Sequence, residues 1–176
     1  MELSNSTAHN YLVNLGNSEI IMTNLSETEV SLIIYDKNKF NTPDYYFSYA
    51  LYSNDEISHE VKIASYNYEV IGPNGFIRKF KGSKKPDLKA VLFNNIAKNE
   101  VELLLTKIST RKPDISLENM YEGKKRDISL DSSTEKIIFN LDKTKGWYDL
   151  RIKTENNSWH FAGRIESGKP TVTDPH

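Results

Sequence analysis

The sequence predicts an all-β fold built from two tandem small antiparallel β-sandwich modules. Apolar residues recur mainly with period two, in short runs rich in Tyr, Ile, Val and Phe, which is typical of half-buried strands. Helical patterns of crossover length are scarce, and this argues against βαβ units. The third observation is an internal similarity between the two halves of the 176 residues.

Alternating apolar runs in the first half predict six strands. They cover residues 19–24, 30–36, 45–52, 59–64, 66–71 and 76–81. Within 45–52, Phe47, Tyr49 and Leu51 share a face that we expect in the core, and Tyr46 and Tyr52 lie on the opposite face. Asn-Gly between the last two runs predicts a hairpin turn, because both residues tolerate positive φ.

The second half predicts a set of strands of similar size. They cover residues 88–93, 101–106, 114–118, 125–130, 136–141, 147–153 and 158–165. The run YNYEV at 66–70, followed by FKG at 80–82, has the same order as YDLRI at 148–152 followed by FAG at 161–163. We therefore expect two copies of one unit.

The expected organisation is a disordered leader over residues 1–14, a first module over 15–83 and a second module over 87–175. A unit of roughly 80–90 residues buries little more than about 60% of its unfolded surface. We therefore expect the modules to pack against each other or against a larger body.

Composition excludes several classes of function. The 24 acidic and 23 basic residues are interspersed and give a net charge of −1, so we expect no nucleic-acid partner. The absence of cysteine excludes disulfides and thiolate chemistry. No apolar run reaches about 18 residues, and the first residues do not have the pattern of a signal peptide.

No catalytic or metal-binding pattern is present, so we expect no catalytic residue, metal or cofactor. His9, His59, His160 and His176 lack metal-ligand spacing, and there is no nucleophile elbow or phosphate loop. His160 is expected to be solvated or at a sheet edge.

Charged residues on strands and loops are expected to be mainly structural. Asp149 is expected to pair with Arg164, or Arg151 with Glu166, across neighbouring strands. The basic runs 84–85 and 124–126 are expected to be solvated, and contact with acidic lipid headgroups is the alternative.

Three aromatic residues are candidates for ligand binding, namely Tyr46, Tyr52 and Trp159. Their rings could lie at a lipid–water interface. A position in the core is the competing interpretation, because aromatic residues on strands are often buried.

Two stretches are more specific than composition. GWYDL at 146–150, followed by WHFAGRIESGKPTVTDP at 159–175, resembles the ending of bacterial phosphocholine-preferring phospholipases C. YEVIGPNGFIRKFKG at 68–82 resembles the other signature of those enzymes. The positions singled out in the two motifs are Gly72, Pro73, Asn74, Gly75, Phe80, Gly82, Gly146, Trp147, Tyr148, Asp149, Phe161, Gly163, Arg164 and Glu166.

In that family the two signatures close two successive copies of a C-terminal accessory domain, and the catalytic domain lies N-terminal to them. The resemblance therefore implies a non-catalytic C-terminal region of an exported phosphatidylcholine or sphingomyelin hydrolase, secreted or periplasmic. Its implied partners are the N-terminal catalytic domain of the parent and choline phospholipid or a membrane surface. The implied role is lipid-substrate or membrane recognition, or scaffolding of the catalytic domain. A stand-alone module that binds carbohydrate or another surface ligand is the alternative.

Overall fold

The computed structural model describes residues 9–166, which form fourteen strands and three single-turn 3-10 helices. The first half contains β1 (Tyr11–Leu15), β2 (Glu19–Asn24), β3 (Val30–Asp36), η1 (Lys37–Lys39), η2 (Pro43–Tyr45), β4 (Tyr46–Leu51), β5 (Glu56–Glu60), β6 (Tyr66–Ile71) and β7 (Ile77–Gly82). The second half contains β8 (Leu88–Asn95), η3 (Ile96–Lys98), β9 (Glu100–Lys107), β10 (Ile115–Asn119), β11 (Lys124–Ile128), β12 (Thr134–Asn140), β13 (Trp147–Lys153) and β14 (Asn157–Arg164).

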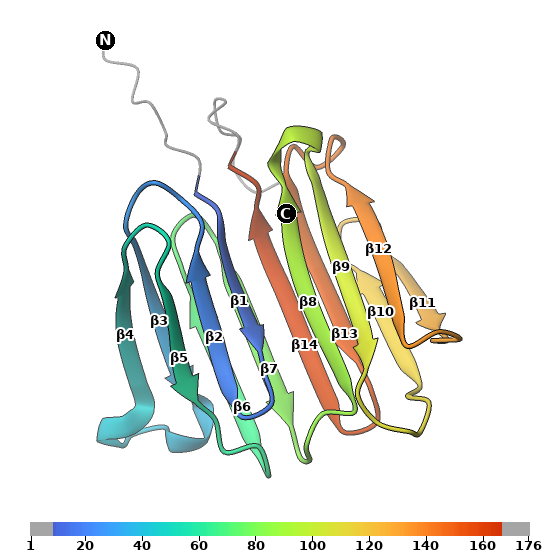
Figure 1. Ribbon diagram of the computed structural model, residues 1–176, viewed down its shortest axis with the longest axis horizontal. Helices are drawn as coiled ribbons and strands as arrows, with labels where there is room; N and C mark the ends of the chain where they lie inside the picture. Colours follow the sequence, from blue (N-terminus) through green and yellow to red (C-terminus); the bar gives the residue numbers. More distant parts are fainter. Residues whose placement is uncertain (1–8, 167–176) are drawn as a thin grey trace.

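The strands form one large sheet and two small ones, all antiparallel. The large sheet has eight strands in the order β11-β10-β13-β14-β7-β6-β3-β4. The small sheets have the orders β1-β2-β5 and β12-β9-β8. Figure 1 shows the two halves side by side, with β7 and β14 at the centre. The all-β, antiparallel sandwich predicted from the sequence is confirmed.

The core lies between the large sheet and the two small sheets. Alternate residues of each strand point into it; on β3, for example, these are Val30, Leu32 and Ile34. Residues of both halves belong to one hydrophobic cluster. The small sheets are also linked, because the Leu92 N–H on β8 donates to Asn14 Oδ1 on β1 at 3.4 Å.

Two elements differ from the sequence prediction. Strand β1 begins at Tyr11, so the expected leader over residues 1–14 is wrong from that residue onward; residues 1–8 lie outside the described part. Tyr11, Val13 and Leu15 are buried. Leu12 lies between them and is also apolar, so the sequence does not alternate there and the strand was not predicted. Strand β5 covers 56–60 instead of the predicted 59–64. Its two inward positions are Ile57 and His59, and a single aliphatic residue is too weak a hydropathy signal to locate the strand.

Sheet continuity across the centre was not predicted. Strands β7 and β14 pair over six positions, from Ile77 opposite Ala162 to Gly82 opposite Asn157. The four-stranded sheets of the two halves therefore merge by main-chain hydrogen bonding, in addition to side-chain packing. The expected module boundary within 83–87 falls in the connection between β7 and β8 and stays a prediction.

Candidate functional site at the junction of the two halves

The two sequence motifs meet at this junction. The first motif ends on β7 and the second includes most of β14, and the six-residue pairing of these strands places the motifs against each other. Lys79 and His160, at the centre of the pairing, lie directly opposite each other. Motif residues therefore hold the halves together, and several of the contacts are buried.

Arg78 is the most buried charged residue of the junction, with 2% of its surface exposed. Its guanidinium donates to the carbonyls of Ile77 and Ala162 at 2.9 and 3.0 Å and to Tyr148 Oη at 2.9 Å. It also stacks over the ring of Phe76 at 4.0 Å. A buried guanidinium is tolerated here because its N–H donors have acceptors from both halves. Arg78 alternates in the sequence with Phe76 and Phe80, on the same face of the strand, and this spacing indicates an inward position.

A tyrosine faces a glycine at each end of the junction. Tyr66 lies opposite Gly82, and Tyr148 lies opposite Gly163. A Cβ on Gly82 would come within 2.6 Å of the Tyr66 ring, and one on Gly163 within 2.8 Å of Tyr148 Oη. The two hydroxyls then bond across the junction, Tyr66 to the side-chain amide of Asn157 and Tyr148 to Arg78, at 2.8 and 2.9 Å.

Burial raises the pKa of Tyr66 well above its ordinary value, and the nearby Asp87 carboxylate adds to this effect. Tyr66 therefore stays protonated at physiological pH and can donate its hydroxyl proton.

The hairpin turn of the first motif contacts the end of the second. Asn74 Nδ2 donates to Glu166 Oε1, and the Glu166 side chain, 8% exposed, also accepts from the His9 N–H at 3.3 Å. Gly75 has a positive φ of 76°, and its Cα faces Trp147 so closely that a Cβ would lie 3.1 Å from the indole. Tyr11 Oη donates to the carbonyl of Pro73 at 3.3 Å. Gly72, beside this turn, leaves no room for a Cβ, which would lie 2.8 Å from Leu32.

The remaining second-motif residues support the start of β13 and the end of β14. Gly146 has a φ of 92°, and its N–H donates to the carbonyl of Leu141. Phe161 is fully buried and contacts the ring of Phe80 edge to face. Residues 167–175, which end the second motif, lie outside the described residues, as does His176.

The expected cross-strand ion pairs are wrong. Asp149 accepts from His160 Nε2 at 2.8 Å and lies 3.7 Å from Arg151 Nε, whereas the Arg164 guanidinium stacks over Trp147 at 5.9 Å. Ala162 lies directly opposite Asp149, so His160 and Arg164 are both diagonal neighbours and register alone does not choose between them. His160 is thus paired with a carboxylate.

The three ligand-binding candidates are not brought together. Tyr46 and Tyr52 are exposed, at 58% and 64%, at the two ends of β4, which is the outer edge strand of the large sheet. Trp159 is 2% exposed and lies in the core, so its proposed role as a surface ligand contact is wrong. Trp159 is two residues before the buried Phe161 on the same strand, so both side chains point to the inner face of the sheet.

The solvent face of the large sheet carries side chains in three rows across the strands. The first row is apolar at its centre, with Ile33, Ile71, Ile77 and Ala162, and ends in Ser48 and Asp149. The second contains Tyr35, Glu69, Lys79, His160, Arg151 and Glu118. The third contains Asn67, Lys81, Ser158, Lys153, Ser116 and Asp127.

An aromatic and ionic cluster closes the second row near β4. Lys37 Nζ lies 3.1 Å from Glu69 Oε1 and 4.8 Å from the centre of the Tyr35 ring. Burial lowers the pKa of Lys37, but hydrogen bonds with Glu69 and Tyr45 outweigh it, so this pKa is raised. Burial likewise opposes ionisation of Glu69, but hydrogen bonds from Lys79 and Lys37 outweigh it and lower its pKa. The cluster stays charged at neutral pH.

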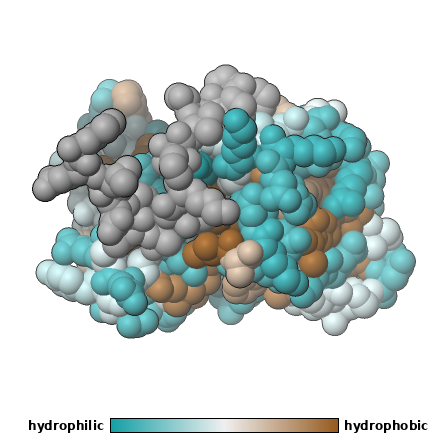
Figure 2. Space-filling view, turned by 90° about the horizontal axis from the view of Figure 1, so that it is seen from above, coloured by the Kyte–Doolittle hydropathy of each residue, from teal (hydrophilic) through white to brown (hydrophobic). Residues whose placement is uncertain are grey.

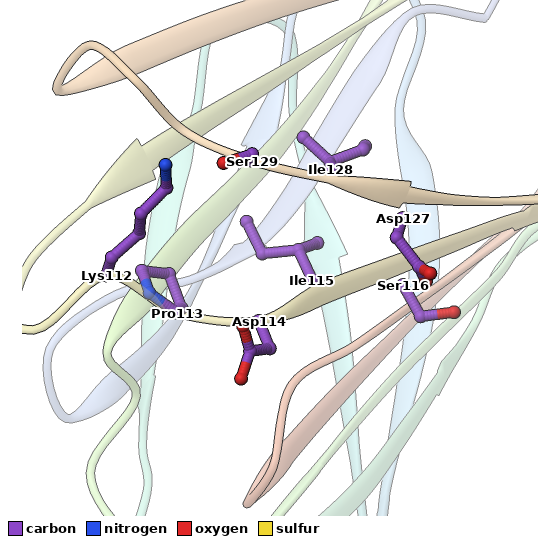
Figure 3. A pocket seen from close by; sticks show the side chains of 8 residues that line it. All are labelled: Lys112, Pro113, Asp114, Ile115, Ser116, Asp127, Ile128 and Ser129. Atoms are coloured by element: carbon purple, nitrogen blue, oxygen red, sulfur yellow. The ribbon is translucent and has the colours of Figure 1, made fainter.

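A groove of about 420 Å³ lies at the β10–β11 edge. Figure 3 shows Lys112, Asp114 and Asp127 pointing in different directions instead of converging.

Within residues 9–166 no three His, Asp or Glu side chains lie close enough together to hold a metal ion. Among the same residues no helix has the length and apolar character needed to cross a bilayer. Figure 2 shows hydrophobic patches separated by hydrophilic residues on the upper surface.

Comparison with known proteins gives consistent relatives. The family described as bacterial phospholipase C, C-terminal domain, matches residues 5–83. A non-hemolytic phospholipase C of Burkholderia pseudomallei is 26% identical over 133 residues, which are 69% of this chain and 19% of that protein. A hemolytic phospholipase C of Pseudomonas aeruginosa is 25% identical over 138 residues, 69% of this chain and 18% of that protein.

The chain thus spans about a fifth of the length of these relatives. The family match begins before β1 and ends one residue after β7, so it includes every strand of the first half. Residues 5–83 of this chain are therefore similar to the family described as bacterial phospholipase C, C-terminal domain.

Proposed function

We propose that this chain is the non-catalytic C-terminal region of a larger, exported phospholipase C and helps that enzyme recognise its lipid substrate or membrane. The observation that carries the proposal is the joining of the two motifs into one eight-stranded sheet. Motif residues make the contacts of this junction, whereas Tyr46 and Tyr52 are exposed near the two ends of the edge strand β4.

We also infer that the chain contains two copies of one module. The small sheets have matching orders, β1-β2-β5 and β8-β9-β12, and so do the two halves of the large sheet, β4-β3-β6-β7 and β11-β10-β13-β14. The tyrosine–glycine pairs at 66 and 82 and at 148 and 163 support this equivalence.

Co-sedimentation of the full chain with phosphatidylcholine vesicles tests the recognition role. We expect binding that weakens in the Tyr46→Ala and Tyr52→Ala variants, because an exposed ring adds apolar contact with the bilayer interface. Phe93→Ala is the matched control, because Phe93 is an exposed aromatic residue on the small sheet β12-β9-β8. An absence of vesicle binding contradicts lipid recognition.

Scaffolding of the catalytic domain is the second role within this proposal. A separately expressed catalytic domain that co-purifies with this chain, without any binding of the chain to vesicles, supports it. Cleavage of a phosphocholine ester by the purified chain contradicts the non-catalytic assignment.

A stand-alone module that binds carbohydrate is the second candidate function. The exposed rings of Tyr46 and Tyr52 favour it, because sugars stack on such rings. A glycan-array signal that Tyr46→Ala abolishes, with no binding to vesicles, would select this candidate.

A further inference from the structure

We propose that Lys81, Lys153 and Ser158 form a binding site for a phosphate group on the solvent face of the large sheet. The three residues line a groove of about 410 Å³ at the end of the β7–β14 junction. The site itself is independent of the proposed function; only a lipid source for the phosphate rests on it.

The register of three neighbouring strands places these side chains together. Ser158 on β14 lies directly opposite Lys81 on β7 and also directly opposite Lys153 on β13. Neighbouring strands are about 4.8 Å apart, so the backbones of the two lysines are roughly 10 Å apart, on either side of the serine. Two flexible ammonium groups can therefore converge on one anion above the Ser158 hydroxyl.

The two lysines differ from Lys79 and His160 on the same face in having no acidic partner. In the neighbouring row, Lys79 pairs with Glu69 at 2.9 Å and His160 pairs with Asp149 at 2.8 Å. Among residues 9–166, no carboxylate lies within ion-pair distance of Lys81 or Lys153, and both are exposed. Neither lysine is therefore neutralised by a direct ion pair.

Polar side chains complete the lining, among them those of Asn38, Asn67 and Asn156. Hydroxyl and amide N–H groups beside two ammonium groups suit the oxygens of a phosphate. One carboxylate, that of Glu155, also lines the groove, but it lies 3.5 Å from Arg111 Nη1, which compensates part of its charge.

Titration of the full chain with inorganic phosphate, followed by amide chemical shifts, tests the site. We expect the largest shifts at residues 81, 153 and 158. Lys81→Ala and Lys153→Ala should each weaken binding about threefold, as expected for one exposed ion contact. Glu155→Gln should tighten binding, because it removes the only acidic side chain that lines the groove.

Lys98→Ala is the matched control, since Lys98 is an exposed lysine on η3, away from this groove. Its affinity for phosphate should equal that of the unchanged chain. Shifts that chloride reproduces at the same ionic strength, or that persist in the double variant Lys81→Ala/Lys153→Ala, overturn the proposal. Both lysines are exposed, so we expect these variants to keep their unfolding temperature.

A second arm separates a lipid headgroup from free phosphate as the source. Vesicles that contain phosphatidic acid are compared with inorganic phosphate on the same variants. Vesicle binding that falls with Lys81→Ala and Lys153→Ala supports the site with a lipid source. Binding of inorganic phosphate without vesicle binding supports the site with a soluble source of phosphate. An absence of binding in both assays overturns the proposed site. Because this readout does not use Tyr46 or Tyr52, its failure is distinguishable from failure of the proposed function.

Discussion

At the scale of single residues, the junction depends on a buried cation that is held by neutral groups. Arg78 bonds to two carbonyls and to the Tyr148 hydroxyl, and it stacks on Phe76. A methionine at this position would fill similar space but leave these acceptors unpaired.

We predict that Arg78→Met lowers the free energy of unfolding by about 2–4 kcal/mol and Tyr148→Phe by about 1–2 kcal/mol. The double variant should lose about 1–2 kcal/mol less than the sum, because one shared hydrogen bond is counted twice. Urea denaturation of the four proteins measures this coupling. Strict additivity would show that the Arg78–Tyr148 bond contributes nothing.

His59 gives the first half a dependence on pH. Burial lowers the pKa of His59 below its ordinary 6.5, and the Asp36 carboxylate opposes this shift only in part. Its Nδ1 lies 2.8 Å from Tyr49 Oη, an arrangement in which the neutral ring accepts the hydroxyl proton. The unfolded chain therefore binds a proton more readily than the folded one.

We predict that the stability contributed by neutral His59 is present above pH 6.5 and is lost as the pH falls from 6.5 towards the lower folded pKa. Urea midpoints measured between about pH 7.5 and 5 should fall, and His59→Gln should flatten that part of the profile. An equal loss with and without His59 contradicts the prediction.

At the scale of elements, each tyrosine–glycine pair fixes how β7 and β14 approach each other. Gly82 lets the Tyr66 ring lie over the opposite strand position, where any side chain would overlap it. This arrangement connects the end of β7 with the Asn157 amide on β14.

We predict that Gly82→Ala lowers the free energy of unfolding by about 1–3 kcal/mol, as overpacking of a filled site does. Gly16→Ala is the control: its nearest contact, the Ile21 side chain at 3.3 Å, is flexible, so a smaller loss is expected. Thermal unfolding measures both. A loss for Gly82→Ala no greater than that for Gly16→Ala would show that the ring moves freely.

The strands themselves could largely be predicted from alternation, because one face of each is buried. Strand β1 was missed and strand β5 was placed a few residues too late, because Leu12 and His59 break the expected hydropathy pattern. The motif residues could also be identified, but their contacts could not. Asn74 and Glu166 are 92 positions apart, and local patterns do not indicate which distant edge strands pair. The alternation of inward and outward side chains along a strand predicts that Arg78 and Trp159 are buried. The same alternation predicts that Tyr46 and Tyr52 are exposed, as they are.

At the scale of the whole molecule, the halves share both a sheet and a core. Six paired positions join β7 to β14, and the hydrophobic cluster contains residues from either side of the junction. A unit of roughly 80–90 residues is only marginally stable alone, so the junction is expected to contribute much of the stability of each half. The two halves should then unfold together.

We predict that Leu150→Ala, a core change in β13, lowers stability by about 2–4 kcal/mol in both halves. Hydrogen exchange provides the measurement: the slowest amides of β3 and β13 should lose equal protection, because they are exposed by the same global opening. Tyr52→Ala, which removes an exposed ring, should leave both unchanged. If β13 alone loses protection, the halves open independently, and the junction then serves only to hold two separately stable sandwiches in line.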